Sequence, residues 1–73
     1  MAKVAVLLAE GFEEIEAVAL IDVLRRADVE VVVVSLGAAE VRGSHGIVVR
    51  ADALIDALDA AALDGVVLPG GMP

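Results

Sequence analysis

Hydrophobic and polar residues alternate in blocks along the chain, and the blocks have the lengths of strands and helices. Three short runs are almost wholly aliphatic, as strands buried on both faces of a parallel sheet usually are: residues 3–8, 29–36 and 65–68. Residues 13–27 place acidic residues first and two arginines last, which complements the dipole of a helix. The pattern therefore predicts a strand, a helix, a second strand and a later strand that ends in Pro-Gly-Gly.

The segment between the second and third predicted strands has a mixed pattern. Residues 40–52 contain two short apolar stretches around Gly-Ser-His-Gly, which predicts two short strands that form a hairpin or an excursion at the sheet edge. We expect Asp52 to cap a short helix over residues 53–63. This alternation is typical of an α/β fold with a parallel sheet. Because doubly wound domains have more strands, we expect residues 1–73 to form one truncated half-domain, in the order strand–helix–strand, hairpin, helix–strand.

Composition narrows the class of protein further. The net charge of −7 disfavours a nucleic acid or an anionic membrane as partner. No apolar stretch approaches the roughly 20 residues that are needed to span a bilayer. We therefore expect a cytoplasmic chain. With one His and no Cys, we expect no metal site. The 60% of apolar residues exceeds what so small a core covers, which predicts a homo-oligomer. The absence of Thr, Asn, Gln, Tyr and Trp fits either a GC-rich or thermophilic genome or a designed, reduced-alphabet protein.

Four glutamates lie close together where the first predicted strand turns into the helix. Glu13 and Glu14 fall in the first helical turn, where carboxylates meet free N–H groups, and we expect Glu10 to be solvated. Glu16 differs, because it begins a helix side whose other members are apolar: Leu20, Val23, Leu24 and Ala27. We therefore expect its carboxylate to be partly desolvated, with a raised pKa, and predict a proton donor or acceptor.

The Pro-Gly-Gly end of the last strand is a second candidate for chemistry. Gly70 and Gly71 allow a close backbone approach, and their N–H groups suit an oxyanion hole, although the local pattern alone favours a tight turn. The first turn has a single glycine, and it lacks both the dinucleotide fingerprint and the phosphate-loop pattern. His45 has no second His or Cys with which to bind a metal, and Ser44 lacks the sequence context of a nucleophile.

The chain resembles the amino-terminal half of the ThiJ/PfpI superfamily, nearest to its protein deglycases, in four segments: "AEGFEEIEAV", "IDVLRRADVEVVVVSL", "VRGSHGIVVRAD" and "DGVVLPGGMP". The resemblance implies a flavodoxin-like sheet related to class I glutamine amidotransferases, dimerisation, and cysteine chemistry without a cofactor. It implies that Glu16 matches a glutamate that hydrogen-bonds the cysteine, and that Gly70 and Gly71 match the oxyanion pocket. His45 and Arg26 match the region near the dimer interface. Reported family activities are glyoxalase, deglycase, protease and chaperone action.

The family cysteine lies farther along than this chain reaches, and the chain contains none, so we expect no covalent catalysis from it alone. Our favoured interpretation is a structural half-domain that self-associates through an exposed sheet edge and apolar helix faces. The alternative is that a separate or lost chain supplies the cysteine. The two together then form a cysteine-dependent hydrolase, glyoxalase or deglycase.

Overall fold

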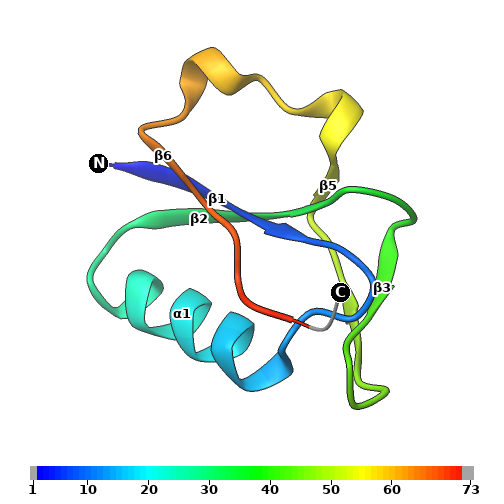
Figure 1. Cartoon of the computed structure of the whole chain (residues 1–73). Helices are drawn as coiled ribbons and strands as arrows, with labels where there is room; N and C mark the ends of the chain where they lie inside the picture. The colour runs from blue at the N-terminus through cyan, green and yellow to red at the C-terminus, as the bar shows by residue number, and fades with distance from the viewer. Residues whose placement is uncertain (1, 72–73) are drawn as a thin grey trace.

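A four-stranded parallel sheet with the order β5-β2-β1-β6 is the centre of the molecule (Figure 1). The computed structural model describes residues 2–71, so the three other residues of the expected domain 1–73 lie outside the described part. The elements are β1 (Lys3–Leu8), α1 (Glu14–Arg26), β2 (Glu30–Ser35), β3 (Glu40–Arg42), β4 (Val48–Arg50), β5 (Ala53–Leu54) and β6 (Gly65–Val67), with two 3-10 helices, η1 (Ile55–Ala57) and η2 (Ala60–Ala62). The predicted α/β class and parallel sheet are confirmed.

Strand β1 lies between β2 and β6 and pairs with both in parallel. Its register runs from Lys3↔Glu30 to Leu8↔Ser35 on one side, and from Val4↔Gly65 on the other. Because parallel strands share one direction, the segments that follow β1 and β6 lie at the same edge of the sheet. In open α/β sheets this carboxyl edge is where ligands bind.

Helix α1 covers one face of the sheet. The buried core between them consists of Val6, Leu8, Phe12, Ala17, Val31, Val33 and Val41. Leu20, Ile21 and Leu24 of α1 pack against this cluster. Figure 1 shows the segment with η1 and η2 arching on the side of the sheet away from α1. The helix is thus held by apolar contacts along one of its sides only, as expected of an amphipathic helix.

The predicted helix over residues 53–63 is wrong. Ala53 and Leu54 instead pair with Val34 and Ser35 of β2, and two single 3-10 turns follow. The Asp52 carboxylate does not cap a helix, because its Oδ2 accepts a hydrogen bond from the Val33 N–H at 2.8 Å. Pairing with β2 holds the start of this segment extended. The remainder is too short to offset the cost of starting an α-helix.

The predicted hairpin is confirmed by β3 and β4, which pair antiparallel from Glu40↔Arg50 to Arg42↔Val48. Its turn contains Gly46 with a φ of +83°, a conformation that favours glycine. The Gly11 N–H donates to the Arg42 carbonyl oxygen at 2.8 Å, so the hairpin stands beside the turn after β1. Within residues 2–71, no helix has the length and apolar character needed to cross a membrane.

Candidate functional site

The turn after β1 and the segment after β6 meet at the carboxyl edge of the sheet. The Glu13 N–H donates to the Gly70 carbonyl oxygen at 2.7 Å, and Phe12 and Gly71 form an isolated antiparallel bridge. A Cβ at Gly71 would lie 2.6 Å from the carbonyl oxygen of Gly11, so only glycine fits this backbone approach. The predicted Pro-Gly-Gly feature therefore lies directly against the start of α1.

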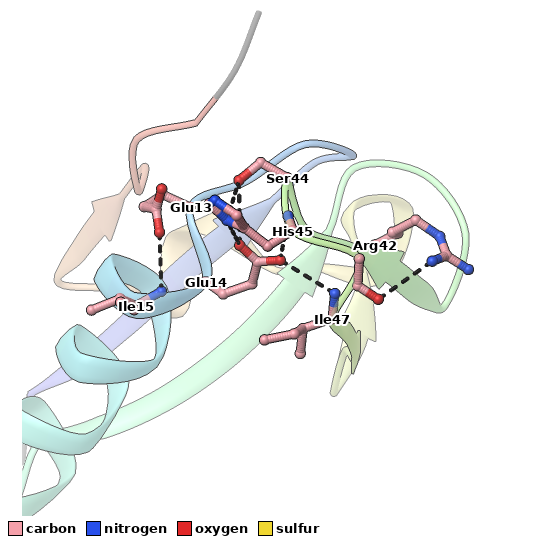
Figure 2. Close-up of polar contacts among 8 residues, drawn as sticks. Glu13, Glu14, Ile15, Arg42, Ser44, His45 and Ile47 are labelled. Atoms are coloured by element: carbon pink, nitrogen blue, oxygen red, sulfur yellow. Dashed lines mark hydrogen bonds and ion pairs between the residues drawn. The ribbon is translucent and has the colours of Figure 1, made fainter.

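Glu14 is the buried acid of this region, with 3% of its surface exposed, and its carboxylate reaches the loop between β3 and β4 (Figure 2). Oε2 accepts hydrogen bonds from the backbone N–H of His45 at 2.7 Å and of Ile47 at 3.2 Å. Oε1 lies 2.9 Å from Nδ1 of His45 and accepts from Ser44 Oγ at 3.3 Å. Such multiple, charge-assisted bonds are what a buried carboxylate requires. The loop and the helix start are thereby joined.

The loop leaves space for this carboxylate because Gly43 has no side chain. A Cβ at Gly43 would lie only 2.5 Å from Oε2 of Glu14. The Gly43 N–H donates to the Ile47 carbonyl oxygen at 2.8 Å, which closes the loop around the carboxylate. Gly43 and Glu14 therefore form one packing unit, although 29 positions separate them in the sequence.

The contact between Glu14 and His45 shifts the pKa of both groups. Burial opposes ionisation of Glu14, but the hydrogen bonds from the His45 side chain and the surrounding backbone outweigh it and lower the pKa of Glu14 from 4.5 to about 2. The hydrogen bond and charge of Glu14, with a further contribution from Glu13, raise the pKa of His45 above its ordinary 6.5. The two groups therefore form an ion pair at every pH between these pKa values, although the His45 side chain is 71% exposed.

The apolar side of α1 differs from the predicted one. The residues that face the core are Glu14, Ala17, Leu20, Ile21 and Leu24, so Leu20 and Leu24 lie as predicted, whereas Val23 is 61% exposed. The helix is therefore rotated so that Glu14, and not Glu16, begins the buried side. Glu14 lies in the first helical turn, as expected, but its carboxylate also bonds the hairpin loop, a contact that the expectation did not include. The same expectation is confirmed for Glu13, whose Oε1 caps the helix by accepting from the Ile15 N–H at 3.4 Å.

Glu16 is exposed, so the prediction that its carboxylate is partly desolvated is wrong. The side chain nevertheless contacts another predicted site residue. Its Oε1 accepts a hydrogen bond from the Gly70 N–H at 3.1 Å, and a Cβ at Gly70 would lie 2.7 Å from that oxygen. The structure thus brings together the predicted carboxylate and the predicted glycine pair. Their roles toward a thiol and an oxyanion stay predictions.

A cavity of about 400 Å³ lies beside this contact, and it is lined by Glu13, Glu16, Ser44, His45 and Gly71. Three residues predicted separately, Glu16, His45 and Gly71, therefore share one cavity. Arg26 is not part of it, because it lies in the last turn of α1 and pairs with Asp22 at 3.1 Å. The expected interfacial role of Arg26 and His45 stays a prediction.

Glu10 is exposed, as expected, but it also has a structural contact. Its Oε2 accepts from the Arg42 N–H at 2.6 Å and so helps to attach the hairpin to the turn after β1. Together with the bond between the Gly11 N–H and the Arg42 carbonyl oxygen, this pairs both backbone groups of Arg42. The turn after β1 therefore positions the hairpin loop over the start of α1.

Glu13, Glu14 and His45 each offer a potential metal-ligand atom, and these atoms lie within 4.8 Å of one another. Both Glu14 oxygens and Nδ1 of His45 are already engaged in hydrogen bonds with each other and with the loop backbone. A metal ion would have to replace these bonds. The donor set therefore fits a hydrogen-bonded cluster better than a metal centre.

Sequence reasoning missed Glu14, Gly43 and the contact of Ser44 with the carboxylate. The available signal was the spacing of Glu14, Ala17, Ile21 and Leu24, which follows a helix period as well as the predicted set does. Gly43 had no such signal. Its role depends on a carboxylate that approaches from a distant element.

A parallel sheet with a glycine turn and a carboxylate at its carboxyl edge defines an α/β domain of flavodoxin-like type. The sequence matches the model of the DJ-1/PfpI family over residues 2–73, and the chain belongs to this family.

Individual relatives agree with this assignment. The chain is 46% identical over 71 residues to protein DJ-1 homolog B of Arabidopsis thaliana, covering 96% of this chain and 16% of that protein. It is 36% identical over 69 residues to deglycase TK1284 of Thermococcus kodakarensis, covering 94% of this chain and 42% of the relative. Oxidised DJ-1 of Toxoplasma gondii superposes with a TM-score of 0.95 at 50% identity, covering 100% of this chain and 40% of that one. The chain thus spans less than half the length of these relatives.

Proposed function

We propose that this chain contributes one wall of a cysteine-dependent active site of the hydrolase, glyoxalase or deglycase type and performs no thiol chemistry alone. The observation that carries the proposal is the hydrogen bond between Glu16 Oε1 and the Gly70 N–H at the carboxyl edge of the sheet. Similarity to an archaeal deglycase supports the reaction class. In this proposal Glu16 faces the thiol, and Gly70 and Gly71 border the oxyanion that forms when the thiolate attacks a carbonyl carbon.

The proposal is tested by complementation. The chain is mixed with a polypeptide that contains the cysteine-bearing remainder of a relative's domain, and consumption of methylglyoxal is followed. We expect turnover only when both polypeptides are present, and a large loss with Glu16→Gln. Glu30→Gln is the matched control, because Glu30 lies at the opposite end of the sheet, where it pairs with Lys3 at 3.7 Å. A stable complex without turnover would contradict the proposal.

A second proposal concerns self-association, and it is favoured by apolar side chains on the outer surface. Ile15, Val18 and Ile47 are exposed to 78%, 52% and 55%, and with Ala19 and Glu14 they line a cavity of about 380 Å³. Among the described residues, β6 pairs on one side only, with β1. Exposed apolar groups and an unpaired strand edge both favour association. We propose that a second copy of the chain covers these surfaces.

Sedimentation equilibrium tests this second proposal. We expect the chain to associate at micromolar concentration and Val18→Lys to shift it toward the monomer, because a charge then lies in the apolar contact. Asp56→Lys is the control, since Asp56 lies in η1, away from α1. A folded wild-type chain that remains monomeric would contradict self-association.

A further inference from the structure

His45 is held by one ring nitrogen and presents the other. Nδ1 lies 2.9 Å from Oε1 of Glu14, and since an ionised carboxylate is only an acceptor, Nδ1 carries the proton. In the neutral imidazole the lone pair is then on Nε2. Within residues 2–71, Nε2 has no hydrogen-bond partner. A buried carboxylate that fixes the tautomer and orientation of an exposed imidazole is the arrangement that supports general-base catalysis.

The cavity beside His45 limits the substrates that could use this base. Glu13 and Glu16 contribute carboxylates to its lining, and these repel anions. Arg42 of the hairpin is the nearby cation, but its Nη1 donates to the Gly46 carbonyl oxygen at 3.3 Å. The cavity volume of about 400 Å³ suits a small molecule. A small uncharged carbonyl compound, with water, fits both the charge and the size.

Ser44 does not complete a serine-type catalytic triad with this pair. Its Oγ lies 3.1 Å from Nδ1 of His45, the same nitrogen that faces Glu14. In a triad the serine and the acid contact opposite nitrogens of the ring. Nε2 is therefore available to a water molecule and not to the serine hydroxyl.

We propose that Glu14 and His45 form a proton-transfer dyad in which Nε2 of His45 acts as a general base on water and hydrolyses small uncharged esters. Nε2 takes a proton from water as the water oxygen attacks the carbonyl carbon. The resulting imidazolium returns that proton to the departing alkoxide as the carbon–oxygen bond breaks. Ester and water thus become a carboxylic acid and an alcohol, and the imidazole is regenerated. Glu14 is a positioning residue, and the reaction needs no cysteine, so it goes beyond the proposed function.

The test uses the chain alone with ethyl dichloroacetate, whose acid product is measured by titration at constant pH. We expect the rate per neutral imidazole to exceed that of N-acetylhistidine amide by about tenfold or more. His45→Asn should remove this excess rate, and the exposed side chain makes the variant compatible with the fold. Glu14→Gln should lower both the rate and the kinetic pKa, which is the pKa obtained from the pH dependence of the rate. Asp56→Asn, which removes a carboxylate in η1, should change neither.

A second measurement keeps the inference testable if Glu14→Gln does not fold. His45 is the one histidine of the chain, so its ring nitrogens can be titrated by ¹⁵N NMR without overlap. We expect protonated Nδ1 in the neutral form, and a wild-type kinetic pKa equal to that of His45 and above that of the model compound. A rate no higher than that of the model compound, or a kinetic pKa that does not follow His45, overturns the inference. Neither result affects the proposed function, whose test depends on an added cysteine.

Discussion

Glu14 and His45 make the stability of this protein depend on pH in two opposite directions. The pKa of Glu14 is lowered by folding, so its stabilising contribution is fully present above 4.5 and is lost as the pH falls toward about 2. The pKa of His45 is raised by folding, so its contribution is fully present below 6.5 and is lost as the pH rises through the raised value. We therefore predict the highest urea midpoint between about pH 4.5 and 6.5.

The two declines can be separated by one substitution. His45→Asn should remove the alkaline decline in the urea midpoint, because no titrating imidazole then remains. The acidic decline should persist, since the backbone N–H groups of residues 45 and 47 still bond the Glu14 carboxylate. An alkaline decline of unchanged size in this variant would show that another group causes it.

Gly43 is predicted to be intolerant of even a methyl group. Gly43→Ala places a Cβ against the Glu14 carboxyl group, and we expect it to lower the free energy of unfolding by about 1–3 kcal/mol in urea denaturation. Gly37→Ala is the matched control, because a Cβ at Gly37 meets no atom within 4 Å. Equal stabilities of the two variants would contradict the packing of Glu14 described above.

Individual residues show where sequence reasoning succeeds and where it does not. The N-terminal capping role of Glu13 depends on its neighbours in sequence, and it was predicted correctly. The contact of Glu14 depends on Gly43 and His45 in another element, so no local pattern reveals it. Glu16 and Gly70 were indicated separately by local pattern and then linked by family resemblance. Their hydrogen bond exists, although the expected burial of Glu16 does not.

At the scale of elements, the rotation of α1 about its axis decides which acid is buried. Two sets of residues, one with Glu14 and one with Glu16, have helical spacing, and both include Leu20 and Leu24. The structure selects the set whose first member can reach donors in the hairpin loop. An apolar pattern alone cannot make that selection, because the donors come from residues 44–47.

The rotation of α1 is tested by comparing two adjacent apolar residues. Leu24 packs against the core, and we expect Leu24→Ala to lower the free energy of unfolding by about 1–2 kcal/mol, which is less than for a fully buried leucine. Val23 is 61% exposed, so Val23→Ala should leave stability unchanged or raise it slightly, because alanine favours helices. Urea denaturation of both variants measures the difference. A larger loss of unfolding free energy from Val23→Ala than from Leu24→Ala would contradict this rotation and favour the helix side that begins with Glu16.

The segment after the hairpin shows how tertiary contacts override a local tendency. Its alanines favour a helix, yet Ala53 and Leu54 add a short strand beside β2. Asp52 contributes to this outcome, because it bonds the Val33 N–H and lies 3.7 Å from Nη2 of Arg25. The sheet therefore determines the conformation of residues 52–54, which sequence periodicity could not predict.

At the scale of the whole molecule, the parallel sheet places distant segments at one edge. The three main strands were predictable because each is a continuous aliphatic run. Their common direction was predictable because a strand, a crossover connection and a second strand usually give a parallel pair. The turn after β1 and the glycines after β6 are thereby brought together, and both line a cavity of about 180 Å³ at the carboxyl edge of the sheet. Residues 2–71 thus contain the sheet edge that we propose as one wall of an active site.

The most direct test of this account is whether Glu16 and Gly70 are in contact in the isolated chain. A ¹⁵N NMR titration follows the Gly70 amide as the carboxylates are protonated. Because Glu16 Oε1 accepts from this N–H at 3.1 Å, we predict a large change in the Gly70 amide shift, and its loss in Glu16→Gln but not in Glu30→Gln. A Gly70 amide that does not respond to acid, or that responds equally in both variants, would contradict a preformed wall of the site.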